Sequence, residues 1–112
     1  MTYPDNITHR AVSTPWGPSQ DAEVIADGIT FHSTASHGGI HLSPTRQAQM
    51  PAYFRDTFAG GPWYEEDCDY VRVALVFPQF FPTLNRDNAL RNLRFCHPAK
   101  ADRFERESNS AA

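Results

Sequence analysis

The chain has 112 residues, of which 40% are hydrophobic and 12% aromatic, and its formal net charge is −3. This length fits one small domain with a single core, and the apolar content excludes a chain that is disordered throughout. With a net negative charge, the protein has no overall positive electrostatic field to attract phosphates, so we expect no direct nucleic-acid binding.

No apolar run approaches the length of a membrane span, and no secretory leader pattern precedes a cleavage site. The two cysteines, Cys68 and Cys96, are too few for a disulfide framework. We therefore expect a cytoplasmic protein with reduced thiols and no membrane contact.

The first 20 residues are predicted to form an extended N-terminal arm, because prolines and Gly17 interrupt a segment without periodicity. Trp16 is expected to dock this arm onto the core, since an indole buries a large apolar area. A single α+β domain is then expected over 21–98, followed by a polar C-terminal tail over 99–112.

The segment from about 22 to 42 predicts a three-stranded antiparallel meander. Val24 and Ile25 favour a first strand, and the Asp27-Gly28 pair that follows is a strong hairpin signal. Residues 29–34 alternate between apolar and polar positions, as a half-buried strand does. After a glycine-rich turn, 40–42 is expected to form the third strand.

Helices are predicted after residue 42. Ser43 is expected to cap a short helix over 45–50, and 51–58 predicts a second short helix or turn. Asn85 is expected to cap a third helix, over 86–95, that points Leu90, Leu93 and Phe95 inward. Together with the central segment described next, these elements would cover one face of the meander.

The central element of the chain is predicted over 63–77, its longest apolar run. The preferred interpretation is an amphipathic helix whose first turn carries Glu65, Glu66 and Asp67, where the helix dipole favours negative charge. The alternative is a strand over 70–77, which contains three β-branched valines. The predicted fold is therefore α+β, with the meander packed against this helix and two or three shorter helices.

The turn at 33–41 is the first candidate for chemistry, because it combines small hydroxyl residues with two histidines and two glycines. His37 could act as a general base beside Cys68 or a neighbouring acid, as in a small hydrolase or transferase. Acidic neighbours raise a thiol pKa, however, which disfavours Cys68 as a nucleophile. The preferred interpretation is a structural contact of His37 with Asp67 or Glu66.

Either tryptophan, Trp16 or Trp63, is expected to shield this polar contact from solvent. A zinc site is a second candidate, with ligands drawn from His37, His41, Asp67, Cys68, Cys96 and His97. None of the paired spacings typical of metal ligands occurs among them, so we predict no metal and no cofactor.

The acidic cluster is the candidate binding surface for a partner. Glu65, Glu66 and Asp69 are expected to face outward, with Asp67 turned inward towards His37. Arginines give the segment 86–106 a locally basic character, diluted by acids, and its role is left open. Such a separation of charges favours protein contacts.

Three motifs, Thr-Pro-Trp-Gly-Pro at 14–18, Ser-Thr-Ala-Ser-His-Gly-Gly at 33–39 and Trp-Tyr-Glu-Glu-Asp-Cys at 63–68, resemble a small uncharacterised domain family. That family is encoded mostly by phages, plasmids and other mobile elements. The resemblance implies a context of accessory genes, often beside anti-defence functions. We therefore expect a non-enzymatic inhibitor of the anti-CRISPR type that binds a nucleic-acid-handling host complex, with the hydrolase or transferase as the alternative.

Overall fold

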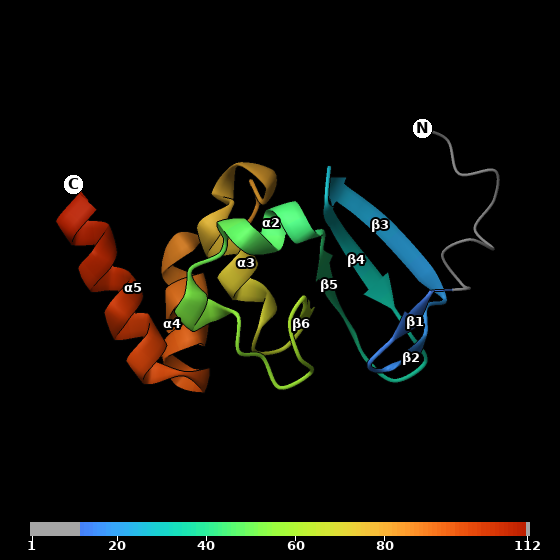
Figure 1. The fold of residues 1–112 in the computed structure, drawn as a ribbon. Helices are drawn as coiled ribbons and strands as arrows, with labels where there is room; N and C mark the ends of the chain where they lie inside the picture. Colours follow the sequence, from blue (N-terminus) through green and yellow to red (C-terminus); the bar gives the residue numbers. More distant parts are fainter. Residues whose placement is uncertain (1–11, 112) are drawn as a thin grey trace.

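The computed structural model describes residues 12–111, with side chains described as far as residue 108. A four-stranded antiparallel sheet occupies one side of the molecule and a group of helices the other (Figure 1). The α+β class is thus as predicted. Within residues 12–111, every helix is too short or too polar to cross a lipid bilayer.

The sheet has four strands rather than the three that were predicted. β3 (Asp21–Ala26), β4 (Ile29–Ser33), β5 (Gly38–Leu42) and β6 (Trp63–Glu65) are neighbours in that order. β6 comes from the segment that was predicted to begin the central helix. Successive side chains of a strand point to opposite faces of the sheet. Tyr64 is therefore fully buried in the core, while Trp63 lies on the opposite face.

The central helix therefore begins later than predicted. α3 (Tyr70–Val76) starts after a turn, and its first turn carries no acidic residue. Antiparallel pairing of Trp63 with His41 and of Glu65 with Gly39 holds the preceding residues in the sheet. The acids expected to complement the helix dipole thus lie in β6 and in the turn before the helix.

The predicted helix starts at Ser43 and Asn85 are confirmed. The Ser43 hydroxyl accepts a hydrogen bond from the Arg46 amide at the start of α2 (Pro44–Gln49). The Asn85 side chain accepts one from the Asn88 amide in α4 (Arg86–Cys96). Between them lie two single-turn 3₁₀ helices, η1 (Ala52–Phe54) and η2 (Pro78–Phe80). α4 buries Leu90 and Leu93, whereas Phe95, which was expected inward, is 89% exposed.

The polar segment after residue 98 is a helix rather than a tail outside the domain. α5 (Pro98–Ala111) starts at a proline, whose fixed φ suits the first helical position. Ala101 is fully buried in the core, and the Phe104 ring stacks on that of Phe54 with centroids 5.5 Å apart. Its polar residues are mostly good helix formers, so composition alone does not separate this helix from a tail.

The predicted arm is folded where it is described. β1 (Ser13–Thr14) and β2 (Gly17–Pro18) form a small hairpin that carries Trp16 at its turn. The Trp16 ring meets Trp63 edge-on, with centroids 5.8 Å apart, and closely covers Gly39. Trp16 thus docks the arm onto the sheet as expected, while the first 11 residues of the predicted arm lie outside the described range.

The helices cover only part of the inner face of the sheet. Ile29, Ile40 and Tyr64 are buried there by the helical layer. β3, at the far edge, lies away from α3 (Figure 1) and has no buried side chain. A concave surface remains between this edge and the residues around η2.

Candidate functional site

A disulfide joins the two cysteines that were expected to be reduced. Cys68 lies in the turn before α3 and Cys96 at the end of α4, with Cα atoms 5.9 Å apart. Neither sulfur is a free thiol, so Cys68 cannot serve His37 as a nucleophile. Disulfides are rare in cytosolic proteins. The expected cytoplasmic location was argued partly from reduced thiols, and the disulfide removes that argument.

Asp69, which was expected on the binding surface, is 3% exposed and belongs to the interior. Its carboxylate lies 3.2 Å from the guanidinium of Arg72, which is fully buried and also donates to the Phe54 carbonyl. The His97 ring lies 3.6 Å from the same carboxylate. Burial and the Arg72 charge hold the pKa of His97 below its ordinary value, although Asp69 opposes them. The hydrogen bond from Arg72 to Phe54 joins α3 to η1, and the buried ion pair removes Asp69 from any contact surface.

His37 is exposed and does not meet the acids as predicted. The Glu66 carboxylate instead accepts a hydrogen bond of 3.0 Å from the backbone amide of Gly38, the next residue. Asp67, expected to turn inward, is exposed. In the described part of the chain, no ion pair joins the His37 ring to either acid. The turn and the acidic segment are thus held together, but through the backbone.

Trp63 packs against histidines other than His37. The Trp63 ring lies beside His41 and His32, with centroids 4.6 and 5.7 Å away. His32 is buried, and its Nδ1 lies 2.8 Å from the Ser19 hydroxyl, which is only 1% exposed. Burial also lowers the pKa of His41. Because the serine is inaccessible, we interpret this pair as a polar anchor between the arm and the sheet.

The candidate zinc ligands are not brought together in the part of the chain that the structure describes. Cys68 and Cys96 are bonded to each other, and His37 projects from an exposed turn. Across the described residues, no group of three or more candidate ligand side chains is placed to hold a metal ion.

The main concave surface lies between the open part of the sheet and η2, and we name it the aromatic groove. Its volume is about 430 Å³. It is lined by Glu23, Ile25, Phe31, Ile40, Tyr70, Phe80, Phe81, Pro82 and Thr83. The groove exists because β3 and β4 extend beyond the edge of the helical layer. Four of its nine lining residues are aromatic.

An acidic hollow continues the groove at one end. It is lined by Phe31, Glu66, Asp67 and Tyr70, and it shares Phe31 and Tyr70 with the groove. Glu23, from β3, supplies a third carboxylate inside the groove itself. Three acids thus face a surface made mostly of aromatic and aliphatic side chains. This combination favours a ligand that is apolar and positively charged.

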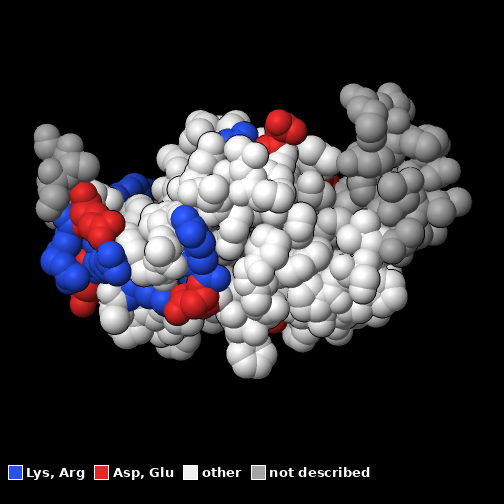
Figure 2. All heavy atoms as spheres, viewed as in Figure 1, with Lys and Arg blue, Asp and Glu red and all other residues white. Residues whose placement is uncertain are grey.

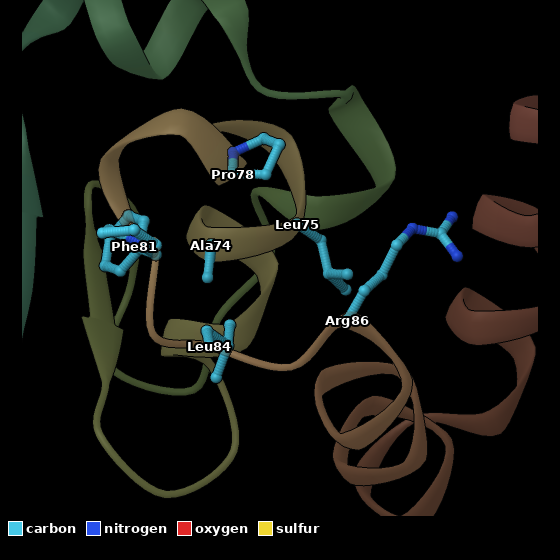
Figure 3. Close-up of a pocket in the computed structure, with 7 residues that line it drawn as sticks. Ala74, Leu75, Pro78, Phe81, Leu84 and Arg86 are labelled. Atoms are coloured by element: carbon cyan, nitrogen blue, oxygen red, sulfur yellow. The ribbon is translucent and has the colours of Figure 1, made fainter.

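A smaller cavity adjoins the other side of the groove, and we name it the anchor cavity. Its volume is about 160 Å³, and it shares Phe81 and Pro82 with the groove. Figure 3 shows Ala74, Pro78 and Leu84 around the space, with the Arg86 side chain extending away from it. The Arg86 guanidinium lies 5.9 Å from the centre of the Phe104 ring. Apart from Arg86, the side chains that line the cavity are apolar.

The arginine-bearing C-terminal segment does not form a uniform basic patch. Figure 2 shows side chains of both charge signs intermixed over α4 and α5. Arg94 forms ion pairs with Asp102 and Glu105, and Arg103 pairs with Glu107 four residues further along. These exposed pairs contribute little stability individually. They offset part of the positive charge at this end of the molecule.

The sequence identified part of this site. It pointed to Glu66, which lines the acidic hollow. It did not find Glu23 or Tyr70. The register pairs Glu23 with Phe31 across two antiparallel strands, so their side chains share a face. Strand alternation could have suggested this pair, but the open part of the sheet depends on the packing of distant helices.

Comparison with known proteins gives one family match. A family model described as a domain of unknown function, DUF7007, matches residues 9–111. Neither the search of curated proteins nor the search of solved structures returned a match.

Proposed function

The chain belongs to the DUF7007 family of domains of unknown function, and we propose that it acts by binding a basic segment of another protein in the aromatic groove. The observation that carries the proposal is the continuity of the groove with the acidic hollow. Both are exposed and share Phe31 and Tyr70. A disulfide-bonded Cys68 favours this binding role over the hydrolase or transferase alternative.

The acids of the groove supply the charge selectivity. Glu23 and Asp67 are exposed, and Glu66 is half-buried while it accepts the Gly38 amide. Lysine and arginine side chains would be attracted by these carboxylates and could lay their apolar stems on the rings. Arginine gains most here, because a guanidinium forks onto carboxylates and stacks on aromatic faces.

The partner that we favour is a nucleic-acid-handling host complex, for which the protein would be an inhibitor of the anti-CRISPR type. Such complexes present basic surfaces to phosphates, and an acidic binder would be steered to them and compete for them. The resemblance to mobile-element proteins supports this context. In place of Asp69, the acidic contacts would come from Glu23, Glu66 and Asp67. Glu65 shares the opposite face of β6 with Trp63 and would not take part.

Peptide selection followed by affinity measurement tests the binding proposal. Random dodecapeptides displayed on phage are selected on the immobilised protein, and enriched sequences are synthesised with a fluorescent label. We expect enrichment of arginine or lysine next to aromatic residues. The variant Glu23→Lys/Asp67→Lys should weaken binding of the selected peptide by about tenfold at low salt, because each exposed charge pair contributes up to about 1 kcal/mol.

The matched control reverses two exposed acids outside the groove, Asp87→Lys/Glu107→Lys, and changes the net charge equally. Its affinity should stay close to that of the wild type. If both variants bind the peptide equally weakly, net charge explains the effect and the groove proposal is wrong. Enrichment of acidic or uncharged peptides would also refute the proposal. Inhibition of a purified CRISPR effector by the wild type, but not by the groove variant, tests the host-complex partner.

A further inference from the structure

We propose that the anchor cavity receives one aromatic side chain of the bound partner, beside the basic residues that occupy the groove and acidic hollow. This inference rests on the proposed function and adds a second recognition element to it. The partner would then be a segment with an aromatic residue at one end and arginine or lysine towards the other. The basic residues of this segment would lie towards the acids of the site, and its aromatic residue would lie in the anchor cavity.

The size and lining of the cavity match an aromatic ring. Its volume of about 160 Å³ is close to the ~150 Å³ of an engineered apolar cavity in another protein that binds benzene. Ala74 and Leu75 of α3 form part of its wall, and both are buried. The Arg86 guanidinium is turned away towards Phe104, so the cavity presents no charge to an entering ring (Figure 3).

The arrangement of shared residues gives the order of the subsites. Phe81 and Pro82 separate the anchor cavity from the groove, and Phe31 and Tyr70 separate the groove from the acidic hollow. The anchor cavity and the acidic hollow therefore adjoin the groove through different residues. A peptide that crosses Phe81 with a ring in the cavity would direct its following residues towards Glu66 and Asp67.

The first experiment uses side-chain analogues and does not require a peptide. p-Cresol and methylguanidinium are titrated separately into protein with isotopically labelled methyl and amide groups. We expect p-cresol to shift the methyl signals of Leu75 and Leu84, and methylguanidinium to shift the amides of Glu66 and Asp67. p-Cresol shifts that map outside the cavity would overturn the inference.

Filling the cavity provides the second experiment. Ala74→Met places a larger side chain in the space from α3, and Leu84→Phe fills it from the loop before α4, in case the first variant does not fold. Each folded variant should lose the p-cresol shifts. Each should also bind the selected peptide about 10- to 100-fold more weakly, the loss expected for one buried aromatic side chain.

The outcomes separate this inference from the proposed function. If the filled variants bind the peptide as tightly as the wild type does, while Glu23→Lys/Asp67→Lys still weakens it, the groove proposal stands and the anchor inference fails. If Leu84 signals change with protein concentration and Phe95→Ser abolishes the change, the cavity holds the exposed Phe95 of a second copy, and the anchor inference is again wrong.

Discussion

Removing the disulfide between Cys68 and Cys96 should cost much of the stability of the domain. The two cysteines are 28 positions apart, and the loop that they close contains all of α3 and most of α4. Without the bond, the unfolded chain regains the entropy of that loop. The chain-entropy relation gives a loss of about 3.5 kcal/mol at 25 °C, against a total of about 5–15 kcal/mol for a typical domain.

The measurement is urea unfolding followed by tryptophan fluorescence, which reports on Trp16 and Trp63 at the sheet face. We compare the oxidised protein, the protein reduced with a phosphine, and the variant Cys68→Ala/Cys96→Ala. The reduced protein and the variant should agree with each other, and both should have a free energy of unfolding about 3.5 kcal/mol below that of the oxidised form. The phosphine should not change the unfolding of the cysteine-free variant. This control separates reduction of the disulfide from any other effect of the phosphine.

Two results would refute this reasoning. The first is a loss of less than about 1 kcal/mol on reduction, which would mean that the unfolded chain is already compact in this region. The second is detection of two alkylatable thiols in the native protein under non-reducing conditions, which would contradict the bond itself. A loss confined to the folding rate, with unfolding unchanged, would instead place the cross-link inside the folding nucleus.

Three further predictions concern the core and the pH response. Asp69→Asn should destabilise the domain by about 3–5 kcal/mol in urea unfolding, because it removes the buried partner of Arg72 and leaves only the exposed Asp56 carboxylate, 3.6 Å away; replacing Asp69 and Arg72 with leucine and methionine should recover much of the loss. Gly39→Ala should cost about 1–3 kcal/mol and shift the Trp16 fluorescence, because the added Cβ would overlap the indole, and an unchanged spectrum would contradict that packing. Since the folded pKa of His97 lies below the unfolded value of about 6.5, stability should be full above that pH and fall as the pH drops through the folded pKa; His97→Gln should flatten this part of the urea midpoint profile.

The features that sequence reasoning predicted correctly depend on local chemistry. Ser43 and Asn85 cap their helices through hydrogen bonds to amides only three residues away, so the signal lies within the motif itself. The Asp27-Gly28 turn is similarly local, with Gly28 at a φ of 81°. Such interactions need no knowledge of the rest of the chain.

The errors come from partners far away in the sequence. Trp63–Glu65 was assigned to a helix because acids and apolar spacing suit one, but pairing with β5 some 24 positions earlier holds it in the sheet. That displacement changes which acids face outward, so Asp69 is buried and Asp67 exposed. The disulfide pairing is equally non-local. The candidate site therefore depends on packing that no local pattern encodes.

The incomplete cover over the sheet has a consequence for local opening of the structure. Four of the five residues of β5 are buried, whereas none of β3 is, so the backbone of β3 is protected by fewer packed neighbours. Amide hydrogen exchange should therefore be graded across the sheet, with β3 exchanging through openings of lower free energy than those of β5. A ligand held against Glu23 and Ile25 would slow exchange in β3 first. The strand that helps to form the groove would thus report, amide by amide, when the groove is filled.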